Sequence, residues 1–163
     1  MTGTVYEEQL FAGAFVAILG ATTAALGALV AYQLAFENGL GSSLGVVSVA
    51  LFVLFAALTV NFRRLSIRLT EAGVTVGYGV IRTTVPWERI TACTADEASS
   101  LRYGGWGVRV TRIGGRWRLV FNTVGDDRVV LRTDGGRFRE IAFSTARPEA
   151  VRATVARHID RTE

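Results

Sequence analysis

Two long stretches without a single charged residue constrain this chain more than any other feature. Residues 10–36 read LFAGAFVAILGATTAALGALVAYQLAF, and residues 40–62 read LGSSLGVVSVALFVLFAALTVNF. A helix needs about 20 apolar residues to cross the hydrocarbon core of a bilayer, whereas a helix in a soluble protein usually turns one polar face to water. The two stretches therefore predict a membrane protein with a hairpin of two transmembrane helices, spanning about 10–36 and 40–62.

Two other interpretations of these stretches stay open at this point. Both could be buried helices of a soluble protein, and the first could be a cleaved signal peptide. The segment before it, residues 1–9, contains Glu7 and Glu8 and no basic residue. A signal peptide begins with a positive segment and has a shorter apolar region, so the sequence argues against it.

The basic residues are confined to the part of the chain after the second stretch. All eighteen are arginines, the first two being Arg63 and Arg64, and eleven of the fourteen acidic residues also follow Phe62. The linker between the stretches, Glu-Asn-Gly, is acidic. Because positive residues flank transmembrane helices on the cytoplasmic side, residues 63–163 are predicted to be a cytoplasmic domain. Two spans return the chain to its starting side, so residues 1–9 form a cytoplasmic segment, and the protein is a multi-pass cell-membrane protein with both termini in the cytoplasm.

Small residues recur every seven positions in both predicted spans. The first span carries Gly13, Gly20 and Gly27, and the second carries Ala50 and Ala57. Small residues allow membrane helices to approach closely, so these five are predicted to form the contact between the two antiparallel helices. The same residues could instead face another subunit.

The remaining hundred residues alternate between apolar and polar positions in short runs separated by turn residues, the pattern of an antiparallel sheet. The predicted strands are 65–70, 74–79, 80–87, 90–95, 106–112, 116–122, 128–133 and 137–144. The last segment, RPEAVRATVARHID (147–160), has Val151, Val155 and Ile159 four residues apart, which predicts an amphipathic helix packed on the sheet.

The glycine-rich stretch 102–121, RYGGWGVRVTRIGGRWRLVF, raises the question of a phosphate-binding loop. Its glycines do not complete G-x-G-x-x-G, and no helix follows whose N-terminus could hold a phosphate. Gly114 and Gly115 instead lie between two alternating runs, which predicts a β-hairpin. Its apolar face is expected to carry Trp117 and Leu119, and its outer face Arg116 and Arg118.

The order of short strands and one C-terminal helix resembles the pleckstrin-homology (PH) fold, and four segments strengthen this resemblance. LTEAGVTV (69–76), VPWERI (85–90), YGGWGVR (103–109) and VVLRTDGGRFREIAFSTARPEAV (129–151) are similar to segments of small prokaryotic membrane proteins that have two transmembrane helices followed by a bacterial PH-like domain. The resemblance implies a mostly antiparallel barrel closed by a C-terminal helix. Lipid-binding PH domains carry basic residues around their first hairpin, whereas the turn here, TEAG, is acidic.

The leading functional hypothesis is a non-enzymatic membrane protein whose PH-like domain binds a protein partner or a second copy, for example by strand addition. The alternative is contact with anionic lipid headgroups or the membrane surface through the arginine-rich strands. Arg109, Arg116, Arg118 and Arg132 are the candidate contacts. These arginines could equally be the solvated outer face of the strands.

Catalysis, cofactors, metal binding and nucleic-acid binding are not expected. The chain has one cysteine, Cys93, and one histidine, His158, and its carboxylates lie mainly at turns. This leaves no catalytic triad, acid–base pair or set of metal ligands. Cys93 is expected to be a small core residue, and His158 to lie at the edge of the core. The aromatic residues of 106–121 are expected on the apolar face, away from the arginines with which a nucleic-acid-binding face would combine them.

Overall fold

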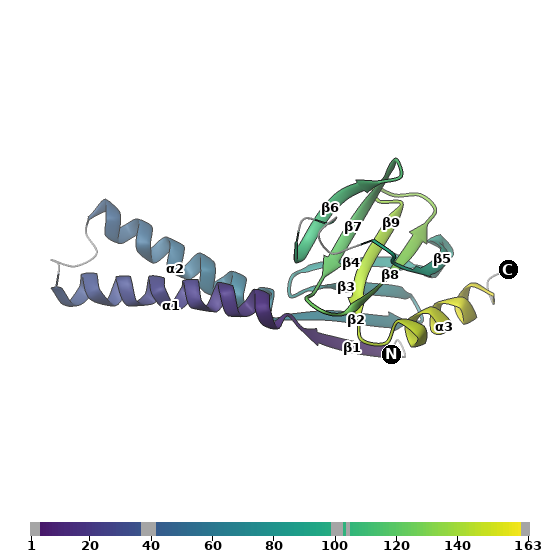
Figure 1. The fold of residues 1–163 in the computed structure, drawn as a ribbon, viewed down its shortest axis with the longest axis horizontal. Helices are drawn as coiled ribbons and strands as arrows, with labels where there is room; N and C mark the ends of the chain where they lie inside the picture. The colour runs from purple at the N-terminus through teal and green to yellow at the C-terminus, as the bar shows by residue number, and fades with distance from the viewer. Residues whose placement is uncertain (1–3, 37–41, 99–102, 104, 161–163) are drawn as a thin grey trace.

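A long helix pair forms one end of the molecule, and two sheets with a final helix form the other (Figure 1). The computed structural model describes residues 4–36, 42–98, 103 and 105–160. The elements are β1 (Thr4–Phe11), α1 (Gly13–Phe36), α2 (Ser43–Asn61), β2 (Arg64–Thr70), β3 (Gly73–Tyr78), β4 (Ile81–Pro86), the short 3-10 helix η1 (Trp87–Arg89), β5 (Ile90–Ala95), β6 (Gly107–Ile113), β7 (Arg116–Asn122), β8 (Asp127–Thr133), β9 (Glu140–Thr145) and α3 (Pro148–Ile159).

The two apolar helices are long enough to cross a membrane and are almost uncovered by the rest of the chain. α1 has 24 residues and α2 has 19, and large apolar side chains such as Leu34, Val46 and Val53 are more than half exposed. A core helix of a soluble protein would be covered on its apolar side. The helices are shorter than the predicted spans, because Leu10 and Phe11 belong to β1 and Phe62 follows the end of α2.

The contact between α1 and α2 does not follow the predicted stripe of small residues. Only Gly27 faces the other helix closely: a Cβ at this position would lie 3.1 Å from the Phe52 ring, whereas one at Gly20 would meet nothing within 4 Å. Gly13 lies against the ring of Phe11, and Ala50 and Ala57 are exposed. The prediction is therefore wrong for four of the five residues.

Polar side chains join the two helices instead. The hydroxyls of Thr23 and Thr59 are 3.1 Å apart, and the buried Ser48 hydroxyl donates to Oε1 of Gln33 at 2.7 Å. Hydrogen bonds between helices are a common source of association in an apolar medium. The side of α2 that meets α1 therefore carries Ser48 and Thr59, whereas Ala50 and Ala57 are exposed.

Replacing Gly27 by Leu is expected to separate the helices, because the new side chain must displace the Phe52 ring. Gly20→Leu is the matched control, since the space around that position is open. The measurement is the thermal stability of the full chain in detergent. Equal effects of the two changes would show that the Gly27–Phe52 contact does not hold the hairpin.

The first sheet has the strand order β1-β2-β3-β4 and is antiparallel throughout. The sequence predicts a separate cytoplasmic segment for residues 1–9, but Thr4–Phe11 form the edge strand β1, with Phe11 opposite Arg64. The Ala12 N–H donates to the Arg63 carbonyl at 3.2 Å. Both helices therefore continue directly into neighbouring, paired strands, so the helix pair and the sheet are joined by two short connections rather than by a flexible linker.

Glu8 ties this edge strand to the C-terminal helix. Its carboxylate accepts hydrogen bonds from the Thr145 hydroxyl at 2.6 Å and from the Ala146 N–H at 2.8 Å, where β9 leads into α3, and from Tyr6 at 2.7 Å. Burial and the neighbouring carboxylate raise the pKa of Tyr6 to about 12, so this phenol remains a donor at neutral pH. The sheet that carries β2, β3 and β4 thus also includes residues from before α1.

The second sheet has the order β5-β8-β9-β7-β6, and β7 runs parallel to β9. The sequence predicted these strands and the turn at Gly114 and Gly115, which have φ values of 55° and 81° as a tight hairpin requires. It did not predict the order, in which the β6–β7 hairpin sits at the outside of the sheet, beside β9. The described strands form two sheets that are mostly antiparallel, and they do not close into the predicted barrel.

The two sheets and α3 enclose one main core. Its members include Leu65, Ile67, Phe121 and Phe143 from the inner sheet faces. Val151 and Val155 of α3 are fully buried, which confirms the amphipathic stripe predicted for this helix. His158 stacks on Trp87 at a ring-centroid distance of 4.2 Å, at the edge of the core as expected.

Candidate interaction surface

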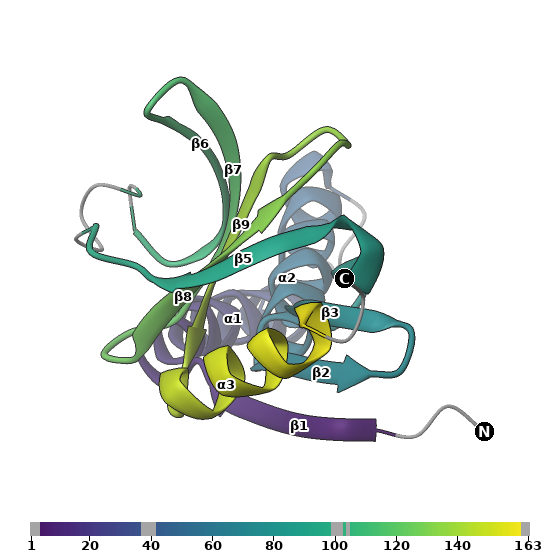
Figure 2. The same ribbon diagram turned by 90° about the vertical axis from the view of Figure 1, so that its right-hand side faces the viewer.

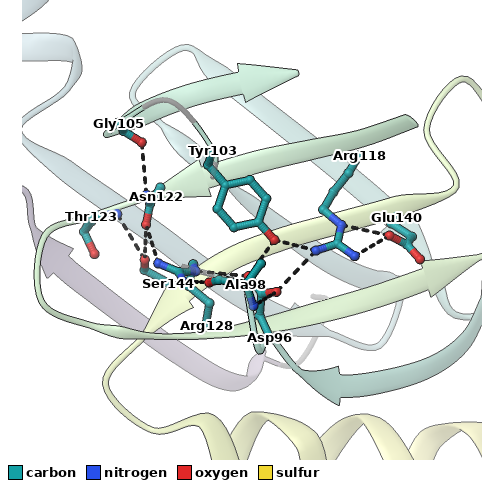
Figure 3. Close-up of polar contacts among 10 residues, drawn as sticks. All are labelled: Asp96, Ala98, Tyr103, Gly105, Arg118, Asn122, Thr123, Arg128, Glu140 and Ser144. Carbon is teal, nitrogen blue, oxygen red and sulfur yellow. Dashed lines mark hydrogen bonds and ion pairs between the residues drawn. The ribbon is translucent and has the colours of Figure 1, made fainter. Parts of the chain in front are cut away.

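A buried polar network lies on the outer face of the second sheet (Figure 3). Arg118 of β7 donates from Nε and Nη2 to Oε2 of Glu140 on β9, at 2.8 Å and 2.6 Å. Its Nη1 lies 3.3 Å from Oδ1 of Asp96, and it also contacts the Tyr103 hydroxyl. Only 8% of Arg118 and 4% of Glu140 are exposed. Each of these buried charges has a partner, and removal of one partner would leave the other charge buried and uncompensated.

Tyr103 and Arg128 complete the same network. The Tyr103 hydroxyl donates to Oδ2 of Asp96 at 2.7 Å, and the same carboxylate oxygen accepts from Nε of Arg128 at 3.0 Å. Burial raises the pKa of Tyr103 to about 12, assisted by the hydrogen bond to Asp96. The phenol therefore keeps its proton at neutral pH. Tyr103 links Asp96 to Arg118 of β7 and acts as a structural residue.

The position of Arg118 contradicts its predicted role as a contact for an anionic surface. Alternation along β7 correctly placed it on the face opposite Leu119, but this face is covered by Asp96, Ala98 and Tyr103. The two carboxylate partners of Arg118 come from other parts of the chain, Asp96 from just after β5 and Glu140 from the start of β9. A pattern within one strand does not reveal which segment covers it.

Two other candidate arginines gather around the same glutamate. Nη1 of Arg116 lies 3.6 Å and Nε of Arg132 lies 3.9 Å from Oε1 of Glu140, and both side chains are more than half exposed. Together with Arg139 they line a pocket of about 480 Å³. The structure thus brings Arg116, Arg118 and Arg132 together, whereas the fourth candidate, Arg109, is exposed nearer the start of β6.

The arginine pocket lies at the end of the sheet that points away from α1 and α2. A Cβ at Gly107, the first residue of β6, would lie 3.7 Å from the Phe15 ring of α1, so β6 begins beside the helices. Ile113, at its other end, pairs with Arg116. At about 3.3 Å per residue, Arg116 is about 20 Å farther along the strand, and Figure 1 shows the hairpin tip rising away from the helices.

The inner face of the β6–β7 hairpin extends beyond the core. Val110 and Trp117 are 52% and 51% exposed, and with Arg137 and Phe138 they line a pocket of about 280 Å³. Trp117 was expected on the apolar face and does share the face of Leu119. It is nevertheless exposed, because the tip of the β6–β7 hairpin extends beyond the first sheet, as both ribbon views show (Figures 1 and 2). Contrary to the sequence prediction, an aromatic side chain is therefore exposed close to an arginine, Arg137.

The outer edge of β6 is available for pairing, since the order of the described strands ends there. Ile113 and Arg116 flank the two-residue turn and therefore form a hydrogen-bonded pair. Because such pairs alternate along an antiparallel ladder, Thr111 and Arg109 direct their backbone groups to β7. The backbone N–H and C=O groups that point away from β7, toward the free edge, are those of Val108, Val110 and Arg112.

The two residues predicted to set the topology follow α2 after one intervening residue, Phe62. Arg63 and Arg64 are both exposed, and Arg64 donates to Gln9 at 3.5 Å. They lie where the helix pair meets the first sheet.

The described residues contain no group of three metal-binding side chains. Cys93 packs against the main core, as expected from the sequence. Burial raises the pKa of its thiol to about 11, because desolvation disfavours the thiolate. The reactive form of a cysteine is the thiolate, so this thiol is a poor nucleophile at neutral pH. The comparisons with protein-family models, curated proteins and solved structures found no match to this chain.

Proposed function

We propose that the chain is a non-enzymatic membrane protein that crosses the bilayer twice and binds an extended, acidic segment of a partner protein along β6. The free edge of β6 beside the Trp117 pocket is the observation that carries this proposal. The proposal includes the relation to PH-like domains, which the strand succession and the docked C-terminal helix support.

Membrane insertion is supported by the uncovered apolar surfaces of α1 and α2. In water, such a continuous apolar surface would drive aggregation. Insertion places the domain on the side of Arg63 and Arg64, which is the cytoplasm by the positive-inside rule. The connections through Ala12 and through Phe62 and Arg63 are too short for the domain to turn freely against the bilayer.

A reporter that is active only in the cytoplasm, fused after Glu163, is expected to be active. Replacing Arg63 and Arg64 by Glu should increase the fraction of molecules inserted in the opposite orientation, since the positive charges are lost from the boundary. Replacing Arg137 and Arg139 by Glu is the matched control, because these arginines lie in the β8–β9 connection, far from the helices along the chain. An inactive reporter on a correctly inserted protein would contradict the topology.

Strand addition explains why an edge strand and a side-chain pocket would occur together. In this mode the backbone hydrogen bonds of the edge provide affinity, and pockets for alternate side chains provide specificity. The outward backbone groups of Val108, Val110 and Arg112 would pair with the partner. The pocket between Val110 and Trp117 has room for one apolar side chain of that partner.

The positive charge along the edge of β6 favours a negatively charged partner. Four arginines lie along or beside it: Arg109, Arg112, Arg116 and Arg137. Opposite charges across strands stabilise pairing and like charges destabilise it. A second copy pairing through β6 would bring Arg109 and Arg112 of both copies together, so the charge favours an acidic partner over self-association.

A short synthetic peptide of alternating glutamate and valine is the probe for this site. We expect the full-length protein in nanodiscs to bind it and to ignore the corresponding lysine–valine peptide. Val110→Pro removes an outward N–H without breaking the β6–β7 ladder, and should weaken binding about tenfold, equivalent to about 1.4 kcal/mol. Val110→Thr keeps the N–H and is the control.

Two results would contradict the proposed site. One is equal binding of the acidic and basic peptides, and the other is equal binding by Val110→Pro and Val110→Thr. Contact with anionic headgroups remains the second candidate, supported by the pocket of Arg116, Arg132 and Arg139. It predicts that added vesicles of anionic lipid, unlike neutral ones, compete with the peptide. The distance of this pocket from the helices disfavours contact with the membrane that they would cross.

A further inference from the structure

The turn between β3 and β4 presents an unusual apolar surface next to the end of α2. Val80 is 90% exposed and Ile81 is 41% exposed. Together with the last turns of α2, including Val60, they line a groove of about 730 Å³ that contains no charged side chain. The apolar surface of α2 therefore continues onto the domain.

Hydrogen bonding fixes this turn at the level of the helix end. The N–H of Val80 donates to Oδ1 of Asn61, the last residue of α2, at 2.8 Å. Gly79 is packed so closely that a Cβ there would lie 2.2 Å from the same oxygen, and its φ is +46°. The turn cannot move away from α2 without breaking these contacts.

The length of α2 indicates how deep the β3–β4 turn would lie in a bilayer that this helix crosses. Its 19 residues span about 28 Å, close to the hydrocarbon thickness of about 30 Å. Asn61 then lies at the boundary between acyl chains and headgroups, with the exposed Arg63 and Arg64 just outside it. Arg82, which follows Ile81, donates from Nε to the carbonyl of Gly79, so a guanidinium lies beside the turn, at the level where the phosphates of a bilayer crossed by α2 would lie.

We infer that Val80 and Ile81 insert into the cytoplasmic leaflet and that lipid acyl chains fill the groove between this turn and α2. This inference rests on the proposed membrane insertion of the helices. It gives the domain a third membrane contact besides its two covalent connections. The domain would then be held at one tilt, with the β6–β7 hairpin directed away from the bilayer.

Nitroxide labels on the full chain in lipid vesicles test this contact. Val80→Cys is made in a Cys93→Ala background, together with Val53→Cys near the middle of α2 and Ala72→Cys in the β2–β3 turn. We expect collisions with oxygen, which concentrates in lipid, to exceed collisions with a water-soluble nickel complex at positions 80 and 53. The reverse is expected at position 72, which lies in the turn at the other end of β3.

The accessibility of the label at position 53 distinguishes a failure of the inference about the turn from a failure of the proposed membrane insertion. If the label at 53 is in lipid and the label at 80 is in water, the inference about the turn is wrong and the membrane spans stand. If the label at 53 is also in water, the proposed insertion fails and the inference fails with it.

Discussion

Replacing Glu140 by Ala is expected to destabilise the domain by about 3–5 kcal/mol, the typical cost of removing one partner from a buried ion pair. The carboxylate holds Nε and Nη2 of Arg118 and lies near Arg116 and Arg132. Without it, Arg118 keeps Asp96 and Tyr103 but loses its two shortest carboxylate contacts, although its side chain is only 10% exposed. Thermal unfolding of the full chain in detergent, followed by tryptophan fluorescence, measures the effect.

Asp134→Ala is the matched control for this change. Asp134 also pairs with an arginine, Arg139, at 3.0 Å, but its side chain is 82% exposed. Exposed pairs contribute at most about 1 kcal/mol, so this variant should unfold close to the wild type. Similar unfolding temperatures for Glu140→Ala and Asp134→Ala would mean that the network around Arg118 does not stabilise the fold.

Replacing Val155 by Asp should have a comparably large effect, because it places a carboxylate between α3 and the sheet. Val155 is fully buried, and α3 packs mainly on β5 and β8. Burying an unpaired charge costs several kcal/mol, a large share of the 5–15 kcal/mol by which a domain is typically stable. Loss of a cooperative unfolding transition is the expected result.

Ala153→Asp introduces the same side chain on the exposed side of α3. It should leave the unfolding transition almost unchanged apart from a small loss of helix propensity. A wild-type transition for Val155→Asp would contradict the docking of this helix on the core.

Local patterns were sufficient to predict most elements of the fold. The uncharged stretches predicted the two long helices, and the glycine pair at 114–115 predicted a hairpin. The four-residue spacing of Val151 and Val155 predicted α3. These signals depend on residues close together in the chain. The strand β1 was not predicted, because Thr4–Phe11 become a strand only by pairing with β2, which lies beyond both helices.

The candidate site was less predictable, because it depends on what covers each strand. Alternation placed Arg118 and Trp117 on the correct opposite faces of β7. The face of β7 that carries Arg118 is nevertheless covered by Tyr103 and Asp96. The opposite face, which carries Trp117, is exposed near the hairpin tip. Similarly, the seven-residue spacing identified a stripe of small residues on each apolar helix, but the sides that meet carry Thr23 and Thr59 instead.

Amide hydrogen exchange along β6 tests the central claim of strand addition most directly. The measurement compares the full-length protein in nanodiscs with and without the glutamate–valine peptide. Strand addition predicts that the peptide slows exchange at the outward amides of Val108, Val110 and Arg112. The inward amides of Arg109 and Thr111, already bonded to β7, should change little. Peptide binding that leaves the outward amides of β6 unprotected would contradict the account.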